Sequence, residues 1–258
     1  MLKRCTFVLF CFFIMLNILC SNVSAKQYDT TEKSWHFLPK KNAEIPNPQK
    51  DSNHIFTEFP CYYLGDTLQK EIYLTFDEGY ENGYTSKILN TLKEKNVKAA
   101  FFVTEPYIRS EPALVKRMIA EGHLVCNHST NHPSMAKILD FSKFSYEIKT
   151  CEDTYKALTG LDMPKFFRPP MGRYSDLSLS YTKELGYKTI FWSFAYVDWF
   201  PNKQPTEKYA KKIILERTHN GAIILLHAVS KTNSNILDYL IDAWRSQGYE
   251  LKSLDNLK

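Results

Sequence analysis

The sequence predicts an α/β domain built on parallel strands. From Glu71 onward, short apolar runs alternate with amphipathic stretches, which is the pattern of repeated strand–helix units. The chain of 258 residues is 44% hydrophobic and 24% charged, so it has enough apolar surface to bury a core. Periodicity alone does not separate a barrel from a doubly wound sheet. In both architectures the chemistry belongs at the carboxyl ends of the strands, and polar residues collect there.

Each element follows from a local pattern. Strands are expected where short apolar runs end in polar residues, at 72–76, 99–104, 124–127, 166–167, 189–192 and 222–226. Helices are expected where apolar residues recur on one face, at 84–95, 112–121, 144–158, 178–185, 205–218 and 235–247. Gly122 and Gly160 supply two of the helix ends, because glycine readily adopts the left-handed conformation that closes a helix.

The first 25 residues predict a signal peptide. Lys3 and Arg4 form a basic segment, residues 7–19 form an apolar run, and residues 23–25 (Val-Ser-Ala) offer small side chains to a signal peptidase. The run is shorter than the roughly 20 apolar residues that cross a bilayer. We therefore expect a secreted, extracytoplasmic protein, with an uncleaved membrane anchor as the alternative.

Residues 26–69 differ in composition from the rest of the chain. Prolines interrupt a stretch rich in Asn, Lys and Ser, and scattered aromatic residues offer docking groups. This composition predicts an irregular N-terminal extension that packs on a domain formed by residues 70–258.

Net charge and cysteine content exclude several classes of protein. A formal charge of +5 is too small and too evenly spread to indicate nucleic-acid binding. Cys61, Cys126 and Cys151 remain after the signal peptide, and no CxxC spacing is present, so neither a disulfide scaffold nor a cysteine zinc site is indicated. We expect these three to be small buried hydrophobes. No protein partner is evident, and we expect a monomer.

Two of the segments that follow predicted strands carry candidate metal or proton-transfer groups. Asp77 and Glu78 end the first strand, and adjacent carboxylates there serve a cation, a reaction or simply a turn. His128 and His132 follow the third strand. Imidazoles at i and i+4 share one side of a helical turn and can bind one ion, although Pro133 makes that turn brief. The alternative is a pair of exposed histidines in a polar loop.

Three further segments carry charged or aromatic groups. Arg168 follows a strand and precedes two prolines, whose stiff loop can hold a guanidinium against a carboxylate. Asp198 and Trp199 lie in an aromatic run that forms either core or a platform for a sugar. His227 ends an apolar strand, where a lone histidine is usually structural.

Together, in this order, the segments resemble the polysaccharide deacetylases, carbohydrate esterase family 4, over roughly residues 71–257. The resemblance rests on Asp77-Glu78-Gly79, His128-x₃-His132, Arg168-Pro169-Pro170-x-Gly172, Asp198-Trp199 and Leu226-His227. Residues 74–85 (LTFDEGYENGYT) are similar to one branch of that family, the secreted muramic-acid deacetylases that prepare the δ-lactam of spore-cortex peptidoglycan.

This resemblance implies a deformed (β/α) barrel and metal-dependent hydrolysis of an N-acetyl group on peptidoglycan glycan strands. It implies a divalent ion, zinc or else cobalt or manganese, held by His128 and His132. The remaining implied roles concern proton transfer and charge: Asp77 as general base held by Arg168, His227 as general acid held by Asp198, and the backbone N–H of Met171 as oxyanion donor.

Glu78 departs from the family pattern, since most members carry a second Asp there as the third metal ligand. Glutamate can also bind zinc through oxygen, although its extra methylene moves the carboxylate by roughly 1.5 Å. We predict Glu78 as a ligand, reached by a local adjustment of the backbone, with an additional water on the ion or weak metal binding as the alternatives. Trp199 and Arg173 are predicted to contact substrate, Arg173 through the acidic lactyl or peptide part of a muramic unit.

Two other functions stay open. One is a deacetylase acting on N-acetylglucosamine in peptidoglycan or chitin-like chains. The other is a wall-binding protein that kept the fold without catalysis. Asp77, Arg168, Asp198 and His227 favour catalysis, because a binder has no need of a matched base and acid.

Overall fold

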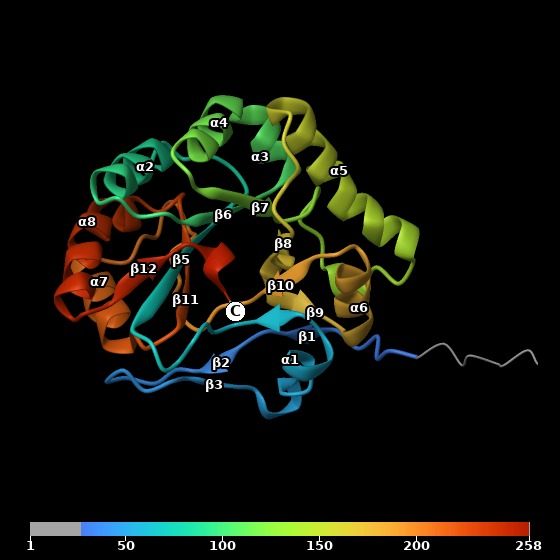
Figure 1. Cartoon of the computed structure of the whole chain (residues 1–258), viewed down its shortest axis with the longest axis horizontal. Helices are drawn as coiled ribbons and strands as arrows, with labels where there is room; N and C mark the ends of the chain where they lie inside the picture. The colour runs from blue at the N-terminus through green and yellow to red at the C-terminus, as the bar shows by residue number, and fades with distance from the viewer. Residues whose placement is uncertain (1–26, 258) are drawn as a thin grey trace, which may run out of the picture.

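The computed structural model describes residues 27–257, and its centre is a sheet of parallel strands (Figure 1). The strand order is β11-β5-β6-β7-β8-β10-β4, with β12 beside the start of β5. The strands are β4 (Cys61–Tyr62), β5 (Glu71–Glu78), β6 (Ala100–Val103), β7 (Leu124–Asn127), β8 (Phe166–Phe167), β10 (Lys188–Ile190), β11 (Ala222–His227) and β12 (Glu250–Lys252). Every pair among them is parallel, which confirms the predicted fold class.

The sheet curls until its two ends nearly meet. Phe194, just beyond β10, bridges to Ile224 of β11, and Leu64, just beyond β4, bridges to Ala222. A hydrogen bond from Gly65 N–H to the Gly221 carbonyl, 2.8 Å long, adds to this seam. Single bridges in place of a full strand ladder make the barrel a deformed one, as expected.

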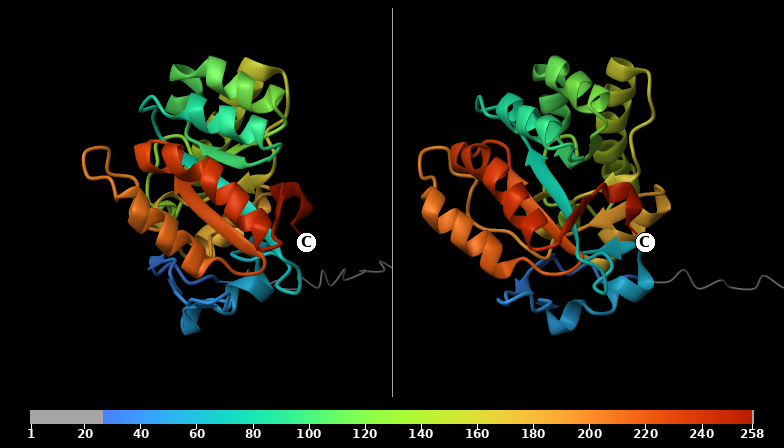
Figure 2. Two further views of the ribbon diagram at one scale, coloured as in Figure 1. Left: turned by 90° about the vertical axis from the view of Figure 1, so that its left-hand side faces the viewer. Right: turned by 60° about the vertical axis from the view of Figure 1, so that its left-hand side comes forward.

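Helices surround the barrel on its outer side (Figures 1 and 2). They are α2 (Thr85–Glu94), α3 (Glu105–Ser110), α4 (Pro112–Ala120), α5 (Phe141–Thr159), α6 (Asp176–Glu184), α7 (Glu207–Arg217) and α8 (Lys231–Ser246). The expected helices lie within a few residues of these bounds. Helix α5 begins earlier than predicted because the side chain of Asp140 caps it, accepting a hydrogen bond from Lys143 N–H. The short α3 and β12 carry too little periodic pattern to be predicted.

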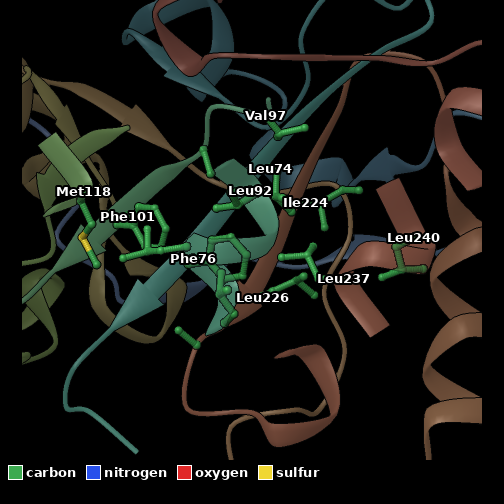
Figure 3. Close-up of a cluster of buried hydrophobic side chains, with 14 of the residues drawn as sticks. Leu74, Phe76, Leu92, Val97, Phe101, Met118, Ile224, Leu226, Leu237 and Leu240 are labelled. Carbon is green, nitrogen blue, oxygen red and sulfur yellow. The ribbon is translucent and has the colours of Figure 1, made fainter. Parts of the chain in front are cut away.

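Successive residues of β5 face opposite sides of the sheet, because side chains alternate along a strand. Leu74 and Phe76 point outward into the main hydrophobic cluster between sheet and helices, where Leu92, Phe101 and Ile224 join them (Figure 3). Tyr73 points inward, into a smaller cluster that includes Phe102, Cys126 and Ile223. The same alternation determines which polar residues of β5 face the inside of the barrel.

The N-terminal segment lies along the side of the barrel, between α7 and α6 (Figure 1), and contains β1 (Lys33–Ser34), β2 (Phe37–Leu38), β3 (Asn47–Pro48) and α1 (Ile55–Glu58). Trp35 stacks on Phe191 with ring centroids 4.7 Å apart. Strand β4 belongs to the central sheet, so the sheet reaches back beyond the predicted domain start at residue 70.

All three cysteines within residues 27–257 are buried. Cys61, Cys126 and Cys151 are free and buried, which confirms that they serve as small core residues. Burial raises the pKa of all three thiols, that of Cys61 to about 12.

The predicted signal peptide, residues 1–25, lies outside the described residues. Within residues 27–257, no helix combines the length and apolarity needed to cross a bilayer.

Candidate active site

Asp77 and His227 lie side by side on the inner face of the sheet. Strands β5 and β11 pair so that Asp77 is in register with His227, and paired residues face the same side. Both residues line a cavity of about 1050 Å³ at the carboxyl ends of the strands. The sheet register therefore brings the predicted base and the predicted acid to one site.

Arg168 holds Asp77 from inside the barrel. It is completely buried, and its Nη1 donates to Asp77 Oδ1 at 2.7 Å. Nη2 donates to Thr75 Oγ1 at 2.9 Å and Nε to the Ile190 carbonyl at 3.1 Å. The guanidinium also lies 4.1 Å from the ring centroid of Phe102. These contacts fix the planar guanidinium of Arg168 in one orientation.

The same contacts set the charge of Asp77. Burial by itself raises the pKa of this carboxyl, but the charges of Arg168, His128 and His227 and the hydrogen bond from Arg168 outweigh it. The net result is a pKa below the ordinary value for aspartate. Asp77 is therefore ionised at neutral pH.

His227 is held by Asp198, a buried carboxylate that comes from the loop after β10. His227 Nδ1–H donates to Asp198 Oδ1 at 2.7 Å, and its backbone N–H donates to Oδ2 at 2.9 Å. Burial lowers the pKa of His227, but the charge of Asp198 and its hydrogen bond raise it more, to above the ordinary histidine value. Because Asp198 holds Nδ1 of the ring, Nε2 is the ring nitrogen that is left to donate a proton.

Asn233 completes this arrangement, and sequence reasoning missed it. Its Nδ2 donates to Asp198 Oδ2 at 2.6 Å and to the His227 carbonyl at 3.1 Å, while Tyr196 Oη donates to its Oδ1. Asn233 lies in the first turn of α8, where Ser230 caps the helix. The Ser-x-x-Asn pattern could have located that helix start, but no local signal points back to Asp198.

His128 and His132 lie together, with ring centroids 4.9 Å apart. No helical turn brings them there, contrary to the expected geometry. Ser129 and His132 have left-handed backbone angles (φ 72° and 55°), and Ser129 Oγ accepts a hydrogen bond from His132 N–H at 2.9 Å. Left-handed non-glycine residues cost of order 1 kcal/mol and persist where the surrounding structure imposes them, often at functional sites.

The tautomer of His128 suits a metal ligand. Its Nδ1 lies 2.8 Å from the Arg168 carbonyl oxygen, which can only accept, so Nδ1 carries the proton. Burial lowers the pKa of His128 to about 4, so the ring is neutral near pH 7. Its Nε2 lone pair is then free and lies 3.6 Å from Asp77 Oδ2. A backbone carbonyl that accepts from one ring nitrogen in this way orients the other nitrogen of a metal-binding imidazole.

Glu78 is not brought together with the two histidines. Strand β5 continues through Glu78, so this side chain takes the outer face, opposite to Asp77, and pairs in register with Val103 of the outer cluster. It is fully buried and does not line the cavity. Burial, followed by the negative charges of Glu81 and Asp77, raises its pKa well above the ordinary glutamate value. This placement argues against the predicted role of Glu78 as third ligand.

Of the three predicted ligands, only His128 and His132 are therefore placed to bind one divalent ion. Across residues 27–257, no group of three or more His, Cys, Asp and Glu side chains is arranged to hold a metal ion. The orientation of the His128 ring is the observation that favours binding there.

Met171 and Trp199 line the cavity, whereas Arg173 does not. Met171 is half exposed and left-handed (φ 58°), and Trp199 has its ring 5.6 Å from that of His227. Arg173 instead pairs with Glu32, with Nη1 3.3 Å from Oε1. The structure thus brings two of the three predicted substrate-contacting residues to the cavity.

Comparisons with known proteins show the family of this chain. Residues 64–190 match the family model for polysaccharide deacetylases. The chain is 42% identical to the peptidoglycan-N-acetylmuramic acid deacetylase PdaA of Bacillus subtilis over 225 residues, 87% of this chain and 85% of PdaA. It is 48% identical to an uncharacterized 30.6 kDa protein of Geobacillus stearothermophilus, over 86% of this chain and 84% of that protein.

The fold gives the same result. The solved structure of B. subtilis PdaA, a family 4 carbohydrate esterase, superimposes with a TM-score of 0.85 at 41% identity, covering 88% of this chain and 97% of PdaA. The resemblance found in the sequence motifs is confirmed: the chain belongs to the polysaccharide deacetylase family.

Proposed function

We propose that this protein hydrolyses the N-acetyl group of N-acetylmuramic acid in peptidoglycan. The observation that carries the proposal is that two ion pairs, Asp77–Arg168 and Asp198–His227, lie side by side and present Asp77 and His227 to one cavity. Amide hydrolysis needs a base and an acid placed in this way. The likeness to B. subtilis PdaA over most of both chains supports muramic acid as the sugar.

Asp77 acts as the general base in this proposal. Arg168 occupies Oδ1, so Oδ2, on the side of His128, is the oxygen that takes a proton from the attacking water. Such a base contributes roughly 10²–10⁴ in rate. The backbone N–H of Met171 donates to the oxyanion that develops on the acyl oxygen.

His227 acts as the general acid. An amine leaves poorly unless it is protonated, and His227 lines the cavity with Nδ1 fixed by Asp198, which leaves Nε2 to donate the proton. The raised pKa keeps the imidazolium available near neutral pH. Trp199, beside His227 at the cavity wall, contacts the sugar in this proposal.

Deacetylases of this family are metal-dependent in general. We propose that His128 and His132 hold the ion, which we take to be zinc, with cobalt or manganese as alternatives. A bound divalent ion polarises the acyl oxygen and lowers the pKa of water from about 15.7 toward 7.

We further propose that the protein is exported, works on glycan strands of the wall as a monomer, and supplies muramic acid for the δ-lactam of spore cortex. The leader composition supports export, and the LTFDEGYENGYT segment supports the cortex branch.

Mass spectrometry of muropeptides tests the proposed substrate. Incubation with purified protein should remove one acetyl group from muramic acid that lacks its peptide, and a chelator should abolish this loss. Acetyl loss from glucosamine would instead favour the alternative deacetylase. Unchanged masses with retained wall binding would show a non-catalytic wall-binding protein.

Asp198→Asn should shift the pH dependence of kcat/KM. Removing the carboxylate leaves burial as the dominant influence, so the pKa of His227 falls below its ordinary value. Because the acid must be protonated, the alkaline limb should move to lower pH. Asp153→Asn, at an exposed position on α5, is the control. An unmoved alkaline limb would remove His227 from the role of acid.

A further inference from the structure

The N-terminal segment reaches the loop that carries Met171. Strand β1 pairs antiparallel with β9 (Arg173–Tyr174), directly after that loop (Figure 1). Trp35 N–H donates to the Gly172 carbonyl at 2.7 Å, and Trp35 Nε1 donates to the Trp192 carbonyl at 2.9 Å. We call residues 32–35 the N-terminal strap.

The loop that the strap contacts is tightly fitted. Met171 and Gly172 both have left-handed backbone angles. A Cβ on Gly172 would lie 2.7 Å from the ring of Trp192 and 3.3 Å from Cβ of Trp35, so Trp192 leaves room only for glycine and the strap packs closely against the same position. Trp35 of the strap thus contacts the residue directly after Met171.

Glu32, the first residue of the strap, also reaches the histidine loop. Its Oε2 accepts a hydrogen bond from Ser134 Oγ, and its Oε1 accepts one from Arg173 Nη1 at 3.3 Å. Ser134 follows His132 by two residues, and Arg173 follows Met171 by two. A single carboxylate thus bridges the two loops that carry His132 and Met171, both of which line the cavity.

We propose that Glu32 is a positioning residue, which holds the His132 loop and the Met171 loop in fixed relation across the cavity. This inference rests on the proposed function. The ion pair is partly exposed, and such pairs contribute only about 0–1 kcal/mol to stability. Glu32 acts on catalysis through the positions of the two loops, because a misplacement of reacting groups by about 1 Å can cost up to roughly 100-fold in rate.

Glu32→Ala tests the proposal. We expect kcat to fall about tenfold with KM changed less than about twofold, because the loops act on the transition state. Affinity for Zn²⁺, titrated on the metal-free full chain, should fall about fivefold or more. The melting temperature should change by no more than about 2 °C. Glu32→Gln keeps an acceptor for Ser134 Oγ and should recover part of the loss.

Matched variants make the test specific. Lys33→Ala, next along the strap, breaks ion pairs with Asp29 and Asp176 that reach neither loop, and should leave kcat unchanged. Ser134→Ala should reproduce part of the Glu32→Ala effect, and the double variant should lose less than the sum of the two.

Two outcomes overturn the proposal. One is unchanged kcat and Zn²⁺ affinity in Glu32→Ala, and the other is a kcat loss that follows a lowered melting temperature and is not recovered by Gln. If the wild-type protein deacetylates no muropeptide, the proposed function fails, while Zn²⁺ affinity still decides the role of Glu32.

Discussion

Asp77→Asn should lower kcat by about 10²–10⁴-fold. The substitution keeps the size of the side chain but removes the carboxylate that takes the proton from water. It also leaves the Arg168 charge buried without its partner, so the variant should be less stable. Acetate release should therefore be measured at a temperature where circular dichroism shows the variant folded.

Asp153→Asn is the matched control for this result, since it removes an exposed carboxylate on α5. It should leave kcat and the melting temperature unchanged. A folded Asp77→Asn variant with kcat within tenfold of the wild type would mean that another group takes the proton.

Arg168→Met should lower the free energy of unfolding by about 3–5 kcal/mol. Methionine fills part of the space, but Asp77 is left as a buried charge whose partner is gone. For a chain of this size that loss corresponds to a fall in melting temperature of roughly 10 °C. Chemical denaturation followed by fluorescence measures the difference directly.

The double variant Asp77→Asn/Arg168→Met separates charge from packing. Removing both charges avoids the unpaired ion, so its stability should exceed that of Arg168→Met although it has no base. Losses that simply add would show that the hydrogen bonds from Arg168 to Thr75 Oγ1 and the Ile190 carbonyl carry its stabilising effect instead.

That Asp77, Arg168 and His227 lie at one edge of the sheet follows from the sequence for a physical reason, whereas their roles came from the resemblance to the family. Parallel strands bring their carboxyl ends to one edge, so polar residues that follow separate apolar runs meet there. The approximate helix bounds follow likewise, because periodicity and end residues are local signals.

Glu78 shows where that reasoning stops. Whether a strand continues by one more residue decides the face to which that residue points, and apolar patterning does not define a strand end so finely. The strand continues, and Glu78 is turned away from the histidines. The i, i+4 spacing of His128 and His132 likewise predicted that the two rings lie close together. It did not predict the cause, which is the left-handed backbone of two residues in that loop.

Asn233 and Glu32 were not predicted because their partners are distant in the chain. Asn233 contacts Asp198 across 35 residues, and Glu32 contacts Ser134 across 102. No periodicity, capping pattern or motif encodes such pairs, which exist only once the barrel has closed.

The burial of Cys61, Cys126 and Cys151 has a consequence for their reactivity. Oxidation requires an accessible thiolate, and burial withholds both access and ionisation from Cys61, Cys126 and Cys151. These three thiols are thereby kept from crosslinking between molecules. The three sulfurs become reactive only when the barrel opens, which makes them internal reporters of global unfolding.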